Sequence, residues 1–133
     1  MESLDLKHSL KLLEKDIILS DNFRKEDIIR QTALQIIKDF NEFAIDITFS
    51  GNSENAYHEL LDQLIPNIDT ILKRDMHQFF NMLYRIDLNE KLIFKTEALF
   101  PDMNKAEVIS HLIIQRDLKK VLIRNYYKET GSI

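Results

Sequence analysis

Carboxylate and imidazole side chains recur at helical spacing in two stretches of the chain, which makes them the first candidates for chemistry. Glu54, His58 and Asp62 follow one another at intervals of four residues, and Glu107 and His111 repeat that interval. Residues four apart lie on one face of a helix, where carboxylates and imidazoles can bind a metal ion. The same spacing also produces surface pairs that stabilise a helix by about 0.2–0.5 kcal/mol.

We favour surface pairs over a metal site, because the known metal patterns are incomplete here. A di-iron helix bundle uses two Glu-x-x-His motifs at a spacing of three, together with two further Glu residues. A zincin helix needs a second His four residues after the first, and Asp62 and Gln63 stand in that region instead. We therefore predict no metal ligand set and no cofactor.

Basic side chains gather in the C-terminal stretch beside Tyr126 and Tyr127. Residues 105–133 carry a net charge of +3, although the whole chain carries -4. Basic residues beside aromatic ones can bind phosphates and stack on bases, which keeps open a regulatory factor that contacts nucleic acid. The acidic balance of the chain does not favour such a partner. We expect Lys119 and Arg124 to complement the helix dipole and the acidic remainder of the protein instead.

The same C-terminal stretch is apolar around much of its circumference. One group of apolar side chains lies on one side of the predicted helix, and Leu118, Val121 and Leu122 are rotated well away from it. Such a helix is either central in a bundle or uses a second face against a partner chain. We predict an interaction surface formed by Leu118, Val121 and Leu122 with Lys119 and Arg124, and a homodimer as its simplest product.

A cluster of methionine and aromatic residues occupies positions 76–84. Side chains of this kind can line an adaptable pocket or a groove for a partner. They also serve as ordinary core residues, which is the simpler interpretation. The cluster consists of Met76, Phe79, Phe80, Met82, Leu83 and Tyr84.

Apolar periodicity predicts helices almost throughout the chain. The stretches at 6–17, from about 23 to 41–44, 57–86 and 105–127 all repeat at intervals of three and four. Pro66 interrupts the third stretch without changing its phase, which predicts a kink rather than a turn.

Capping patterns and one loop mark where these helices begin and end. They start at Asp75, Asp87 and Asn104, each followed three residues later by Gln or Glu. Residues 45–49 alternate like a strand that has no obvious partner, so we predict an extended connection to the loop at Gly51.

These elements predict an all-α fold, a single domain over residues 1–133 and a bundle of five or six helices with mostly antiparallel neighbours. The chain has only two Gly and two Pro and no Cys, which excludes disulfides, thiolate metal sites and a Cys nucleophile. No signal peptide, membrane span or catalytic motif is apparent, so we expect a cytoplasmic protein with no membrane partner.

A non-enzymatic helical interaction module, self-associating or part of a complex, is the leading hypothesis for the function. The alternatives are a helical bundle that binds a small ligand or a metal ion, and a regulatory factor that contacts nucleic acid.

Overall fold

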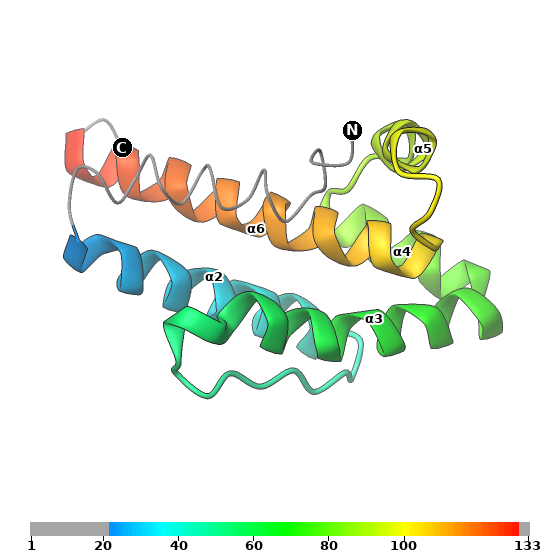
Figure 1. Ribbon diagram of the computed structural model, residues 1–133, viewed down its shortest axis with the longest axis horizontal. Coiled ribbons are helices and arrows are strands. Elements are labelled where there is room, and N and C mark those ends of the chain that lie inside the picture. The colour runs from blue at the N-terminus through cyan, green and yellow to red at the C-terminus, as the bar shows by residue number, and fades with distance from the viewer. Residues whose placement is uncertain (1–21, 131–133) are drawn as a thin grey trace.

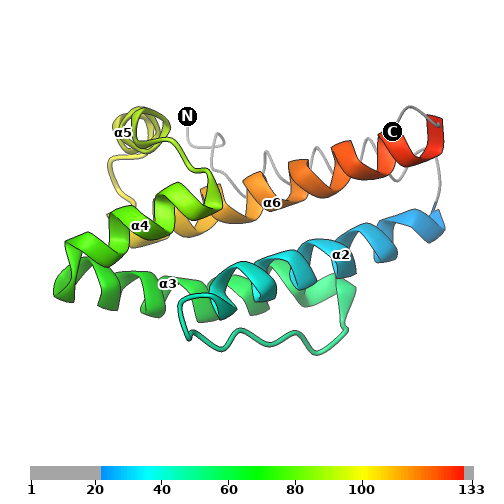
Figure 2. The same cartoon turned by 180° about the vertical axis from the view of Figure 1, so that it is seen from behind.

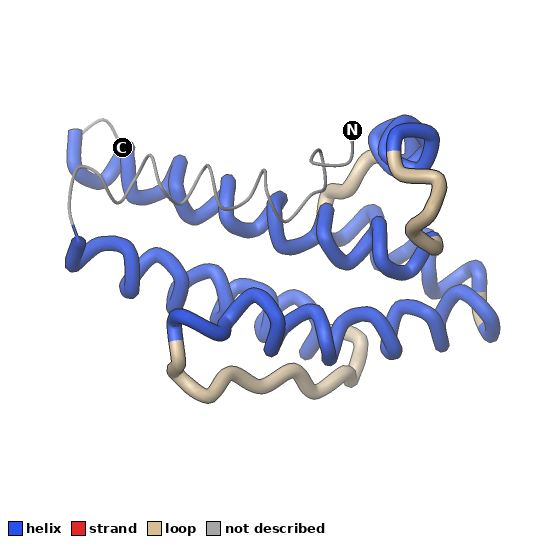
Figure 3. Tube along the Cα trace, in the orientation of Figure 1, coloured by secondary structure: helices blue, strands red, loops and turns tan. Residues whose placement is uncertain are grey.

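The computed structural model describes residues 22–130, and within that range the chain forms α-helices joined by loops, of which the one over residues 42–52 is long (Figures 1 and 3). No strand occurs in this part of the chain, which confirms the predicted all-α bundle. The helix predicted over residues 6–17 lies outside the described residues. The elements are α2 (Asn22–Asn41), a short 3₁₀ helix η2 (Ser53–Asn55), α3 (Ala56–Arg74), α4 (Met76–Ile86), α5 (Glu90–Leu99) and α6 (Lys105–Thr130).

Helix α6 is the centre of the bundle. It packs against α2 along one side and against α3 along another, and α5 lies across its N-terminal half (Figures 1 and 2). Every residue from Val108 to Ile114 is buried, so this segment has no solvent-facing side. A helix that is buried around its whole circumference belongs in the interior of a bundle, which explains why its sequence is apolar on two sides.

Helix α3 carries the apolar stripe that the sequence predicts. Leu61, Leu64, Ile68 and Ile71 are all buried in the core. The helix is continuous through Pro66, whose ring faces solvent, as the unchanged phase of the stripe indicated. Pro66 therefore does not divide this stretch into two helices.

The caps at the helix starts are largely those that the sequence predicts. Asp75 accepts a hydrogen bond from the Gln78 backbone N–H at 3.0 Å and begins α4. At the start of α6, Asn104 accepts from the Glu107 backbone N–H at 2.9 Å, and the Glu107 carboxylate accepts from the Asn104 N–H at 3.1 Å. This reciprocal pair is a complete capping box, and it satisfies two otherwise unpaired donors.

The predicted cap at Asp87 is wrong. Asp87 ends α4 in the left-handed conformation, with φ 65° and ψ 49°. Asn89 begins α5 instead, because its side chain accepts from the Lys91 backbone N–H at 2.7 Å. Aspartate tolerates left-handed backbone better than most residues, so it serves as the C-terminal cap that glycine usually provides.

Residues 42–44 form a turn that ends α2, and residues 45–50 then run in an extended conformation toward η2, as predicted. Ile47 is buried and Ile45 and Phe49 are half-buried, whereas Asp46 and Thr48 face solvent. The alternation of the sequence thus reflects one face packed on the helices, without a neighbouring strand in the described part of the chain.

Candidate functional site

The residues predicted as possible metal ligands do not converge. Glu54, His58 and Asp62 are exposed on one side of the molecule. Glu107 forms the capping box at the start of α6, and His111 is buried in the core. Among residues 22–130, no group of three or more His, Cys, Asp or Glu side chains is placed to hold a metal ion.

His111 has a structural contact that the sequence did not reveal. Its Nδ1 is hydrogen-bonded to the hydroxyl group of Tyr57 on α3, and the two ring centres lie 5.5 Å apart. The two residues are 54 positions apart, and Tyr57 appeared in the sequence only as a member of an apolar stripe. The pair joins α3 to α6 and gives a buried imidazole one of the partners that it needs.

The residues predicted to form an interaction surface on α6 lie mostly inside the chain. Leu118 and Val121 are buried, and Leu122 is half-buried against the same core. Lys119 and Arg124 are exposed, and an Arg124 guanidinium nitrogen donates to the side-chain oxygen of Gln35 on α2 at 3.3 Å. The apolar circumference of α6 is thus explained within one chain, so it no longer argues for a partner at this position.

A different apolar surface lies between α4 and α5. The two helices form a groove with a volume of about 450 Å³, which we call the α4–α5 groove. Its lining comes from α3, α4, α5 and the start of α6. The lining residues are Leu72, Met76, Phe79, Phe80, Leu83, Glu90, Ile93, Phe94, Glu97 and Lys105.

Large apolar side chains are exposed along both walls of the groove. On α4, Met76 is 49% exposed and Phe80 is 46% exposed, one helical turn apart. On α5, Phe94 is 75% exposed. The base of the groove contains Leu83 and Ile93, which are buried. The methionine and aromatic cluster seen in the sequence is therefore divided, with one side in the core and the other on a concave surface.

The charged residues at the groove lie mainly on α5. Glu97 forms an ion pair with Lys105 at 2.9 Å, which leaves that position close to neutral. Glu90, in the first turn of α5, is exposed and has no ion pair among the described residues. The α5 wall therefore presents one free negative charge beside the exposed ring of Phe94.

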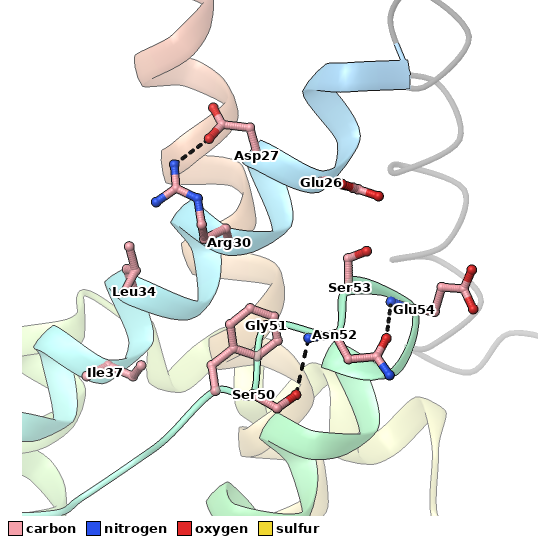
Figure 4. A pocket seen from close by; sticks show the side chains of 11 residues that line it. Glu26, Asp27, Arg30, Leu34, Ile37, Ser50, Gly51, Asn52, Ser53 and Glu54 are labelled. Carbon is pink, nitrogen blue, oxygen red and sulfur yellow. Dashed lines mark hydrogen bonds and ion pairs between the residues drawn. The ribbon is translucent and has the colours of Figure 1, made fainter.

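A second cavity, with a volume of about 840 Å³, lies between α2 and the segment 49–54 (Figure 4). It is open and bordered by carboxylates, and among the described lining residues only Arg30 is basic. Arg30 donates to Asp27 at 2.5 Å, and this bond, followed by one from Gln31, lowers the pKa of the Asp27 carboxyl. Arg30 is thus already paired within its own helix. The lining residues are Glu26, Asp27, Arg30, Leu34, Ile37, Phe49, Ser50, Gly51, Asn52, Ser53 and Glu54.

Two side chains on α3 hold the wall of this cavity in place. The Gln63 amide forms hydrogen bonds with the backbone N–H and the carbonyl of Thr48, both at 2.8 Å. The Glu59 carboxylate accepts from the Ser50 backbone N–H at 2.8 Å and from its hydroxyl at 2.9 Å. Gly51 follows with φ +97°, a conformation that side-chain-bearing residues rarely adopt.

Two carboxyl groups meet at the interface of α2 and α6. Asp117 is 0% exposed, and the carboxyl group of Asp39 is close enough to act on its pKa. Burial, followed by the hydrogen bond with Asp39 and the negative charge of that residue, raises the pKa of Asp117 to about 8. No sequence pattern indicates this pair, because the two residues are far apart along the chain and each looks like an ordinary polar position.

Comparisons of the chain with family models, curated proteins and solved structures find no match. Within residues 22–130, no helix combines the length and the apolar character that crossing a bilayer requires.

Proposed function

We propose that this protein is a helical interaction module that binds an amphipathic helix of another protein in the α4–α5 groove. The observation that supports the proposal is the concave apolar surface on which Met76, Phe80 and Phe94 are exposed. Grooves between two helices accept the apolar face of a third helix, and methionine adapts its shape to the side chains that enter. Exposed aromatic residues gathered in one concave place are typical of binding surfaces.

The groove also indicates the chemistry of the partner. Its base and walls require apolar side chains spaced by three and four residues on the incoming helix. Glu90 carries a negative charge beside Phe94, and its free carboxylate favours a Lys or Arg on the flank of the partner that faces α5. The proposed partner is therefore a basic amphipathic helix, and a second copy of this chain is the competing occupant.

Synthetic peptides test the proposal directly. The probe is a labelled helical peptide with Leu at positions i, i+3, i+4 and i+7 and Lys on both flanks. A scrambled peptide of the same composition and a peptide with Glu in place of Lys serve as controls. We expect saturable binding of the first peptide alone, with amide chemical shifts changing at α4 and α5.

Two substitutions of exposed apolar residues provide matched variants. Phe94→Glu places a charge in the groove, whereas Leu99→Glu places one on the same helix outside it, and both side chains are largely exposed in the native protein. Neither change disturbs the core, so both variants should fold. Binding should be lost in Phe94→Glu and retained in Leu99→Glu. Equal binding by both variants, or equal binding of the scrambled peptide, contradicts the proposal.

The other two hypotheses have less support from the geometry. A small ligand in the cavity beside Arg30 would meet a guanidinium that is already paired with Asp27. Nucleic acid at the end of α6 would depend on Lys119, Arg124 and Lys128, which are exposed. The spacing of nine residues places Lys119 and Lys128 on opposite sides of the helix, and the protein is acidic. Neither arrangement offers a concave surface with unpaired groups that match its ligand.

A further inference from the structure

The carboxyl groups of Asp39 and Asp117 carry three oxygen atoms without a hydrogen-bond donor. Both oxygens of Asp117 and the Oδ2 atom of Asp39 are buried and unpartnered, and only the Oδ1 atom of Asp39 accepts a bond, from the Gln35 amide at 3.0 Å. Ionised carboxylates can only accept hydrogen bonds, so two of them in this place leave every one of these oxygens unsatisfied. A buried, unpaired pair of this kind requires a missing donor.

One proton supplies that donor. When one of the two carboxyl groups is protonated, its O–H group donates to the other, and the like-charge repulsion disappears. The proton then lies between the two carboxyl groups. Asp39 lies on α2 and Asp117 on α6, and these two helices pack against each other.

We propose that Asp39 and Asp117 form a proton-binding site in which one shared proton at neutral pH holds α2 against α6. This site is separate from the α4–α5 groove, and the inference does not depend on the proposed function. Its consequence is that the packing of the two longest described helices depends on pH.

A bound metal cation could satisfy the same oxygen atoms in place of a proton. The residues around the pair do not favour a metal cation. Ca²⁺ requires six to eight oxygen ligands and Mg²⁺ about six in octahedral geometry, whereas two carboxyl groups and one amide are what the described residues offer. Two cations of the chain, Lys120 and Arg116, already act on Asp117 from its own helix. They oppose the entry of a further cation and lower the tendency of Asp117 to hold its proton.

The remaining neighbours of the pair determine whether the pKa of Asp117 is raised or lowered. On α2, Gln35 bridges the site to Arg124, because it donates to Asp39 and accepts from the guanidinium group. No charged group of α3 or α5 in the described part of the chain acts on Asp117. Burial and the Asp39 carboxyl therefore prevail over the two nearby cations, and the pKa of Asp117 is raised to about 8 from its ordinary value of 3.8.

A raised pKa makes the folded state bind a proton that the unfolded chain releases. Across the interval between the ordinary pKa of 3.8 and the folded value of about 8, unfolding releases this proton, so stability falls as pH rises. Below that interval both states are protonated, and above it both are ionised, so the dependence vanishes at either end. The contribution of the pair is thus largest in acid and is lost by about pH 8.

The test is urea denaturation of the full chain at pH values from 5 to 9. We expect the wild-type midpoint to fall as pH rises. Asp117→Asn should have a flatter profile and a higher midpoint at pH 8, because its amide donates to Asp39 without titrating. Asp39→Asn should flatten the profile only in part, because burial, the larger cause of the raised pKa, still acts on Asp117. Asp62→Asn, at an exposed carboxyl, is the matched control and should keep the wild-type slope.

Infrared difference spectroscopy of the wild-type protein keeps the test independent of how well the variants fold. A protonated carboxylic acid gives a carbonyl band distinct from that of a carboxylate, and we expect this band at pH 7 in wild type and in Asp62→Asn, and not in Asp117→Asn. A wild-type spectrum without the band, or a pH profile unchanged in both pair variants, overturns the proposal. Stoichiometric Ca²⁺ or Mg²⁺ in the purified protein, whose removal by dialysis against EDTA lowers the stability, also overturns the proposal. In that case a cation, and not a proton, lies between the two carboxyl groups.

Discussion

The side-chain amide of Gln63 pairs with both backbone polar groups of Thr48, accepting from its N–H and donating to its carbonyl. One turn earlier on α3, Glu59 accepts from the backbone N–H of Ser50. Four helical residues rise about 6 Å, and two extended residues span about 6.6 Å, so the two elements match in length. Helix α3 thereby replaces the neighbouring strand that residues 45–50 would otherwise need.

Gln63→Leu should destabilise the protein by about 1 kcal/mol, because the hydrogen bonds of Gln63 with the Thr48 backbone, the Thr48 hydroxyl and the Glu59 carbonyl are lost and water replaces them only in part. The local effect should be larger than the global one. We expect the amide hydrogen of Thr48 to exchange faster with solvent, since the bond to Gln63 is its protection. Asp62→Asn, at the adjacent exposed position, should leave that exchange rate unchanged. Protection of Thr48 that persists in Gln63→Leu would show that the pairing does not hold the segment.

Gly51→Ala should cost about 1–2 kcal/mol through backbone strain alone. The residue has φ +97°, and an added Cβ atom would meet no other atom within 4 Å, so no clash contributes. Chemical denaturation measures the loss. Ala44, also in left-handed backbone with φ 59°, provides the reverse change. Ala44→Gly should be neutral or slightly stabilising, because relief of strain offsets the greater freedom of the unfolded chain.

The sequence predicts the helices well because their information is local. The spacing of Leu61, Leu64 and Ile68 and the side chain of Asn104 act within one or two turns, so the pattern alone locates them. The cap at Asn89 was missed because two polar residues, Asp87 and Asn89, compete for one helix start. Only the left-handed turn that ends α4 decides between them.

The candidate sites were harder to predict because they depend on contacts between distant residues. The pairs Asp39–Asp117 and Tyr57–His111 each join two helices, and no local sequence pattern connects the two members of either pair. The α4–α5 groove was predicted in part, since Met76 and Phe80 belong to the cluster that the sequence indicated as a possible groove for a partner. Their exposure depends on where α5 lies, which the sequence of α4 does not specify.

Asn104→Ala should destabilise the protein by about 1 kcal/mol, the usual cost of losing a helix N-cap. The side chain of Asn104 accepts from the Glu107 backbone N–H, and α6 is the central helix, so a frayed start affects the whole bundle. Thermal denaturation followed by circular dichroism gives the change. Asn104→Asp should retain most of the stability, because its carboxylate is an equally good cap. A loss as large in Asn104→Asp as in Asn104→Ala would argue against a capping role.

Leu118→Ala distinguishes a core residue from an interface residue. Leu118 is buried within one chain, so its truncation should cost about 2–5 kcal/mol, as for other buried leucines. Ile123→Ala, at a half-exposed position on the same helix, should cost far less.

Protein concentration supplies the decisive comparison. If Leu118 packs within the monomer, the denaturation midpoints of the wild type and of Leu118→Ala should not change over a hundredfold range of concentration. An interface residue behaves differently, because the stability of a dimer rises with the concentration of its subunits. A wild-type midpoint that rises with concentration, together with a Leu118→Ala midpoint that does not, would return Leu118 to an interface between two copies. Such a result would also favour a second copy over a basic helix as the partner of this protein.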